Sequence, residues 1–123
     1  MRQVKVLYLP QEGVDPLWDK LVVDLVSGHH DLTVWDGARS AAADFANVEV
    51  VIEMGGFAGA RDIPDTSRNV SLWQVLSTGL DHTDVAGLKA RGFTVTHCPG
   101  LLSSMALAES AMMLMLMLSR RTN

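Results

Sequence analysis

Five short apolar runs alternate with helical segments along this 123-residue chain, and this alternation limits the possible folds more than any other feature. The runs are Val4–Leu9, Leu32–Trp35, Val48–Ile52, Leu72–Leu76 and Phe93–Thr96. Strands that alternate with helices pair in parallel, are covered on both faces and are joined by right-handed crossovers. The sequence therefore predicts an α/β, flavodoxin-like, doubly wound sheet of about five parallel strands.

Helix signals lie between these runs. Asp15 precedes Pro16 as a capping residue, and Gly28 ends the helix that they open. Apolar residues fall at helical spacing within it, namely Leu17, Leu21, Val22, Leu25 and Val26. Further helices are expected over Ala41–Ala46, from Thr83 or Asp84 to Gly92, and from a cap at Ser103 or Ser104 to about Arg120.

The segment Leu101–Leu118 is mostly Leu, Met and Ala. A membrane span requires about 20 predominantly apolar residues, and Glu109 near the middle of a lone span would be costly. We therefore expect no membrane insertion. A helix that is apolar on nearly every side is instead expected to be buried between layers or between domains.

Composition excludes several classes of function. The net charge is −4 and no Lys/Arg cluster is present, so the sequence does not predict nucleic-acid binding. Cys98 is the single cysteine and no metal-ligand spacing surrounds it, which indicates a reducing, cytoplasmic setting and no metal. The first residues run into a short strand, and they do not resemble the core of a signal peptide.

Two loops are candidates for a ligand site, because ligands of such sheets bind beyond the carboxyl ends of the strands. The sequence Gly55-Gly56-Phe57 follows the third run, and Thr78-Gly79-Leu80 follows the fourth. Glycines allow close approach of the backbone, and successive N–H groups can bind an anion such as a small carboxylate. The alternative is that the glycines only permit tight turns.

Motifs of other chemistries are absent from the sequence. It has no G-x-G-x-x-G after a strand, no G-x-x-x-x-G-K-[ST] and no G-x-S-x-G. His97 and Cys98 are adjacent, but neighbours at a strand end point in opposite directions, which disfavours a catalytic pair. His82 has no obvious partner in the sequence and is interpreted as a helix-start residue.

The order of motifs in the second half carries a resemblance to a known family. It comprises Leu76-Ser77-Thr78-Gly79-Leu80-Asp81-His82-Thr83-Asp84, then Arg91-Gly92-Phe93-Thr94-Val95, Cys98-Pro99-Gly100, Ala108-Glu109 and Arg120-Arg121. This series resembles the D-isomer-specific 2-hydroxyacid dehydrogenases, which include phosphoglycerate dehydrogenase, glyoxylate/hydroxypyruvate reductase and formate dehydrogenase. Residues 72–121 carry the resemblance, whereas residues 1–71 match only in the order of elements.

The resemblance implies roles for several residues. Backbone N–H groups at Thr78-Gly79 would bind the substrate carboxylate, Thr78 would also lie near the nicotinamide, and the loop Gly55-Gly56-Phe57 would border the substrate. Residues 1–100 would form the substrate-binding domain. Residues 101–121 would form a connecting helix toward a Rossmann cofactor domain and contribute to a homodimer interface.

The sequence also departs from the family pattern. The family's catalytic arginine, glutamate and histidine belong to the Rossmann domain, and neither Glu109 nor Arg120-Arg121 matches them. We therefore expect this chain to be inactive alone and to bind no cofactor. Its parent would be an NAD- or NADP-dependent oxidoreductase acting on a small D-2-hydroxy acid or 2-oxo acid.

Two alternatives belong to other functional classes. A flavodoxin-like ligand-sensing module would share the five strands, but a receiver domain needs acidic residues where this chain has Leu9-Pro10-Gln11-Glu12. A dimerisation domain built around the Met-rich helix would bind no small carboxylate.

Overall fold

The structure, a computed structural model, describes residues 2–11, 13–36, 41–54 and 67–120. Its elements begin and end within about two residues of the expected ones, which is the usual uncertainty of such boundaries. In chain order they are β1 (Lys5–Leu9), α1 (Pro16–Ser27), β2 (Asp31–Val34), α2 (Ala41–Phe45), β3 (Val50–Glu53), β4 (Leu72–Val75), α3 (Val85–Ala90), β5 (Thr94–His97), the short 3₁₀ helix η2 (Gly100–Leu102) and α4 (Ser104–Ser119).

The five strands form one parallel sheet in the order β2-β1-β3-β4-β5, which confirms the predicted doubly wound layer. The register aligns Leu9, Glu53, Val75 and His97 in one row at the carboxyl ends. From β1 the chain passes first to β2 on one side and then to β3 on the other. The strand order therefore reverses between β1 and β3, and such a reversal is where ligands bind in sheets of this kind.

The hydrophobic core lies on one face of the sheet. Leu7, Val51 and Trp73 are paired across β1, β3 and β4, and each is fully buried. Phe45 and Phe93 both stack with Trp73, with ring centroids 6.4 and 6.1 Å from its own. Aromatic pairs at these distances add to the free energy gained by burial. This face carries α3, whose Leu88 is also fully buried in the core.

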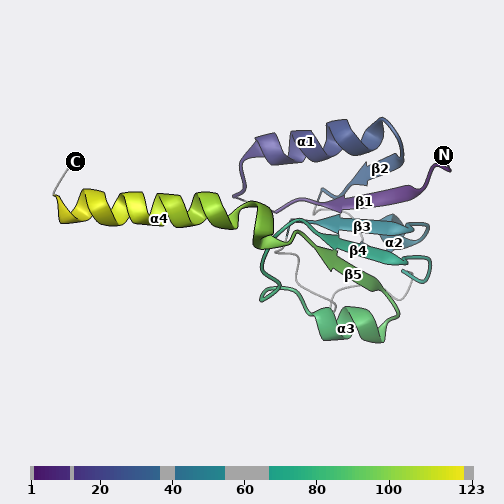
Figure 1. The fold of residues 1–123 in the computed structure, drawn as a ribbon. Helices are drawn as coiled ribbons and strands as arrows, with labels where there is room; N and C mark the ends of the chain where they lie inside the picture. The colour runs from purple at the N-terminus through teal and green to yellow at the C-terminus, as the bar shows by residue number, and fades with distance from the viewer. Residues whose placement is uncertain (1, 12, 37–40, 55–66, 121–123) are drawn as a thin grey trace.

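The opposite face is covered less completely. Figure 1 shows α1 on the other side of the sheet from α3. Asp15 caps α1 as predicted, since its side chain accepts the Leu17 N–H at 2.9 Å. The buried Tyr8 hydroxyl donates to Asp19 of α1 at 2.5 Å, and both burial and this carboxylate raise the pKa of Tyr8. The helix buries none of its residues, however, and the apolar side chains of Leu17, Trp18, Leu21 and Leu25 are exposed.

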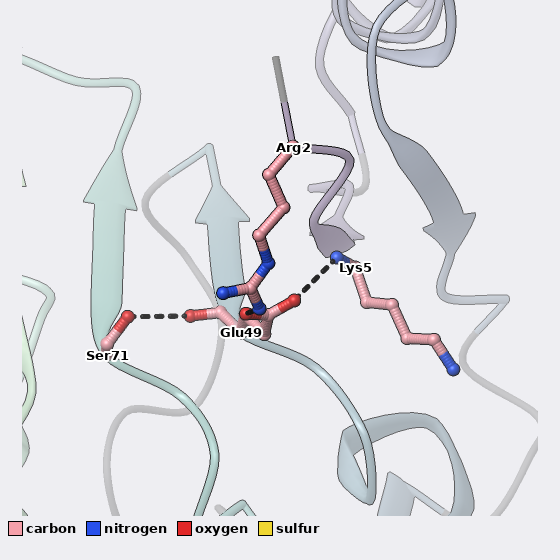
Figure 2. Close-up of polar contacts among 4 residues, drawn as sticks. All are labelled: Arg2, Lys5, Glu49 and Ser71. Atoms are coloured by element: carbon pink, nitrogen blue, oxygen red, sulfur yellow. Dashed lines mark hydrogen bonds and ion pairs between the residues drawn. The ribbon is translucent and has the colours of Figure 1, made fainter.

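The amino ends of the strands are joined by Glu49 (Figure 2). Its carboxylate forms an ion pair with Arg2 and accepts the Lys5 N–H at 3.4 Å, while its carbonyl oxygen accepts the Ser71 hydroxyl at 3.3 Å. The Arg2 side chain is mostly exposed, and an ion pair of that kind contributes about 1 kcal/mol or less to stability. These contacts hold β1, β3 and β4 in register at the edge opposite the candidate site.

Helix α4 leaves the layer beyond the carboxyl ends of the strands and projects away from it (Figure 1). Ser103 occupies the cap position, but its hydroxyl donates to the Gly100 carbonyl at 3.3 Å, and neither Ser103 nor Ser104 caps the helix with its side chain. The helix therefore has its cap at the predicted residue, Ser103, but without a side-chain hydrogen bond to its first N–H groups. Every residue from 101 to 120 is exposed, so the expected burial of this helix does not occur within the described chain. No described helix has the length and apolar character that a membrane span needs.

Candidate site at the carboxyl edge of the sheet

The loop that follows β4 carries the described part of the predicted site. Thr78 and Gly79 are exposed at its tip, whereas Leu80 is half-buried and packs against the hydrophobic core. Within the described part of the chain, neither the Thr78 N–H nor the Gly79 N–H has a hydrogen-bond acceptor. Two successive N–H donors at the carboxyl edge of a parallel sheet form the kind of concavity that binds an anion. The packing of Leu80 against the core anchors this loop to the sheet.

Hydrogen bonds within the loop hold it in a compact turn. The Ser77 hydroxyl donates to the Gly79 carbonyl at 2.7 Å, and the Thr83 N–H donates to the Leu80 carbonyl at 3.0 Å. The ring Nε2 of His82 lies 3.4 Å from the Ser77 hydroxyl, so His82 does have a partner inside the loop. Because the carbonyl groups point to these donors, the backbone at Thr78-Gly79 is held in a fixed orientation.

The end of β5 and the segment that follows it contact the same loop. The His97 ring contacts the Thr78 carbonyl at 3.0 Å through Nδ1, which must carry the proton because a carbonyl oxygen only accepts. The Cys98 N–H donates to the Ser77 carbonyl at 3.1 Å. A Cβ at Gly100 would approach the Thr78 methyl group to 2.9 Å, so a larger residue there would require the Thr78 side chain to move. His97 and Gly100 are thus site residues that the sequence did not identify, since the pairing of Val75 with His97, which brings His97 to this loop, is seen only in the sheet.

Glu53 is a further residue that the sequence did not identify. It ends β3 at the point where the strand order reverses, and only 1% of its surface is exposed. Its carboxylate accepts the Thr83 hydroxyl at 3.0 Å. Burial raises the pKa of Glu53, while Trp73, Thr83 and the charge of His82 act in the opposite direction. The Trp73 indole lowers the pKa of Glu53 by its proximity, since its Nε1 has no hydrogen-bond partner of good geometry among the described residues. An acidic residue at the end of an otherwise aliphatic strand was the available signal.

The remaining predicted residues, Gly55, Gly56 and Phe57, lie outside the described part of the chain. A groove of about 610 Å³ runs along α4, lined by Glu109, Met112, Met113, Leu116, Met117 and Arg120. This groove is the open, mostly apolar surface of one helix, whereas the strand ends carry polar groups. The carboxyl edge is therefore the better candidate for ligand chemistry.

The N-termini of α1 and α3 are poorly suited to a dinucleotide, and the described residues contain no cluster of metal ligands. A pyrophosphate needs free N–H groups at a helix N-terminus, but Asp15 occupies that of α1 and Asp84 that of α3, where each carboxylate accepts a backbone N–H. Their negative charges would also repel phosphate. Among the described residues, no three His, Cys, Asp or Glu side chains are grouped as metal ligands would be.

Comparisons with solved structures show the same architecture in larger proteins. The pyruvate reductase of Chlamydomonas reinhardtii matches with a TM-score of 0.69 and 17% identity over 97% of this chain and 36% of its own. The NADPH-dependent glyoxylate/hydroxypyruvate reductase of Sinorhizobium meliloti, in complex with NADP and malonate, matches with 0.68 and 19% over 94% and 34%. The D-lactate dehydrogenase of Aquifex aeolicus, complexed with NAD and lactic acid, matches with 0.62 and 23% over 91% and 33%.

This chain spans about a third of the length of these three structures. A search of curated protein sequences finds no significant match. The profile of the family described as "D-isomer specific 2-hydroxyacid dehydrogenase, catalytic domain" matches residues 6–112, which include the five strands except for the first residue of β1, and about half of α4. The chain therefore belongs to the D-isomer-specific 2-hydroxyacid dehydrogenase family.

Proposed function

We propose that this chain is the substrate-binding domain of an NAD(P)-dependent oxidoreductase, and that its Thr78-Gly79 backbone binds the carboxylate of a small D-2-hydroxy acid or 2-oxo acid. The observation that carries this proposal is a pair of successive N–H groups, on two exposed residues at the carboxyl edge of the sheet, that have no acceptor among the described residues. A carboxylate oxygen is a strong acceptor for such donors, and hydrogen bonds to charged groups are stronger than those between neutral groups.

Hydride transfer needs groups beyond those described. The nicotinamide cofactor supplies the hydride chemistry when it is bound, and the protein orients the substrate. Since the N-termini of α1 and α3 are occupied by Asp15 and Asp84, we propose that a separate Rossmann domain of the parent protein binds NAD or NADP. Residues 1–100 would form the substrate domain and residues 101–121 the connection to it. The fragment alone would bind no cofactor and would be inactive, and we place the parent in the cytoplasm.

A second proposal concerns α4, whose exposed apolar surface favours association. Glu109 and Arg120 lie at opposite ends of its groove, three turns apart on the same face. In an antiparallel pair related by a two-fold axis, each Glu109 would face the Arg120 of the second copy, with the methionines between them. We propose a homodimer through this helix. It is also the observation that favours the alternative role, a dimerisation module without catalysis.

Titration of the chain with pyruvate, followed by the backbone amide signals of Thr78 and Gly79, tests the first proposal. We expect both signals to move and to saturate together, while that of Gly92, in the turn between α3 and β5, stays constant. Acetate serves as a control for the 2-oxo group, and acetone serves as a control for the carboxylate. If pyruvate moves no signal of this loop, the chain is better explained as a dimerisation module.

A further inference from the structure

The end of β3 places a carboxyl group in the core of the layer. Glu53 is 1% exposed, and the register sets it between Leu9 of β1 and Val75 of β4. Strands that are buried in parallel sheets usually hold aliphatic residues, because a buried carboxylate costs free energy even when it has a partner. A glutamate at this position therefore calls for a role that valine could not fill.

Glu53 bonds to both ends of the loop that carries Thr78 and Gly79. Its backbone carbonyl accepts the Leu76 N–H at 2.7 Å, just before the loop, and its side chain accepts the Thr83 hydroxyl at 3.0 Å, where the loop ends. One residue thus fixes both ends of the segment 77–82. It does so next to the reversal of strand order between β1 and β3.

The charge of Glu53 also acts on this loop. Across the described neighbours, β1 contributes the apolar Leu9 and β4 contributes Val75 and Trp73, so His82 is the titratable group that acts on the carboxylate. Thr78 follows Val75 by three residues, a span of at most about 11 Å. Val75 is the partner of Glu53 on the neighbouring strand, about 5 Å away, so the Cα atoms of Glu53 and Thr78 are at most about 16 Å apart. A negative charge in the protein interior is screened less than it would be in water, and it would repel a carboxylate at the loop.

We propose that Glu53 is a positioning residue for the Thr78-Gly79 backbone, and that its neutral form admits an anionic carboxylate more readily than its charged form. The first half stands on the two hydrogen bonds alone. The second half rests on the proposed function, because it requires a carboxylate at the loop.

Hydrogen exchange of the loop amides tests the positioning role in the unliganded chain. Thr83→Val removes the hydroxyl and keeps the shape, and we expect the hydrogen-bonded amides that hold the loop, those of Leu76 and Cys98, to exchange about tenfold faster, as for the loss of one hydrogen bond. Thr83→Ser restores the hydroxyl and should exchange as the wild type does. Glu49→Gln, at the other end of β3, is the matched control and should leave the loop unchanged. Wild-type exchange in a folded Thr83→Val chain, or equally fast exchange in Thr83→Ser, would overturn the role.

The pH dependence of pyruvate affinity tests the role of the charge. As pH rises through the raised pKa of Glu53, we expect the wild-type chain to lose affinity several-fold, and Glu53→Gln to lose none of it, since glutamine stays neutral. Equal pH dependence in the two chains would overturn the coupling. If neither chain binds pyruvate, the proposed carboxylate site fails and the coupling fails with it. The exchange measurement still decides the positioning role, so the two failures are distinguishable.

Discussion

The sheet and helix α4 are both rich in apolar residues, yet those of the sheet are largely buried and those of α4 are exposed. Four of the five residues of β1 are buried, whereas no residue of α4 is. Exposure of the large apolar side chains within α4 ranges from 39% for Met117 to 80% for Leu118. Hydrophobicity therefore indicates which surfaces need to be buried, and the described residues bury the apolar side chains of the sheet but not those of α4.

The difference extends to how each region is stabilised. The sheet has stacked aromatic rings, a buried row of aliphatic residues and helices held by aspartate caps. A helix of 16 residues with no buried face is marginal in water on its own. The stability of the layer should therefore be independent of α4, while the order of α4 should depend on a partner surface.

The largest effect should come from the core. Trp73→Ala removes the ring that stacks with both Phe45 and Phe93 and leaves a cavity, so we expect the free energy of unfolding to fall by about 3–5 kcal/mol. Met113→Ala is the matched substitution of an exposed apolar residue in α4, and we expect it to change the free energy of unfolding by less than about 0.5 kcal/mol. Urea denaturation of dilute protein measures both. Equal losses would mean that α4 and the sheet unfold together.

Self-association, in contrast to stability, should depend on α4 and not on the core of the sheet. Replacing Leu116 by Glu and Met117 by Lys places charges in the apolar groove without changing the net charge. We expect self-association to weaken at least a hundredfold, or about 3 kcal/mol, with the stability of the sheet unchanged. Sedimentation at several concentrations measures this, and Lys89→Glu on the exposed face of α3 is the control. A wild-type chain that stays monomeric at high concentration would contradict the proposed dimer.

A smaller, pH-dependent effect distinguishes the two ends of β3. Burial raises the pKa of Glu53 in the folded chain, so the wild type is most stable relative to Glu53→Gln at low pH, where the folded and unfolded chains are both protonated. As pH rises from the unfolded pKa to the folded pKa, the unfolded chain ionises first, and Glu53→Gln gains relative stability. A tenfold difference between the two acid constants corresponds to about 1.4 kcal/mol.

Thermal unfolding from pH 4 to pH 8 follows this relative stability. Glu49→Gln is the matched control, because it removes the ion pair with Arg2 at the amino end of the same strand. A relative stability of Glu53→Gln that is constant over this range would show that burial does not disfavour the charged carboxylate.

Most of the fold could be predicted from local signals. Asp15 before Pro16, Gly28 after an apolar helix and Asp84 before another set the helix ends, and the alternation of elements set the parallel sheet. The placement of α4 could not be predicted in this way. Its composition indicates that it needs burial, but composition does not say whether the burying surface belongs to this chain.

The site was only partly accessible to sequence reasoning. Thr78 and Gly79 lie next to each other in the chain, so their pattern could be recognised. Glu53, Thr83 and His97 come from three different segments, and only the strand register brings them to one loop. Parallel pairing joins residues that are far apart in the sequence, so local motifs cannot predict which residues it brings together.

The smallest effect compares two caps that look equivalent in the sequence. The Asp84 carboxylate accepts the Gly87 N–H at 2.9 Å, so Asp84→Ala should destabilise the layer by about 1 kcal/mol. Ser103 precedes α4, but its hydroxyl bonds to the Gly100 carbonyl and leaves the helix amides unsatisfied. Ser103→Ala should therefore change the free energy of unfolding by only about a few tenths of a kcal/mol. Urea denaturation of both variants measures the difference, and a loss of about 1 kcal/mol in Ser103→Ala would mean that the hydroxyl caps α4 in solution and that this helix contributes to the stability of the layer.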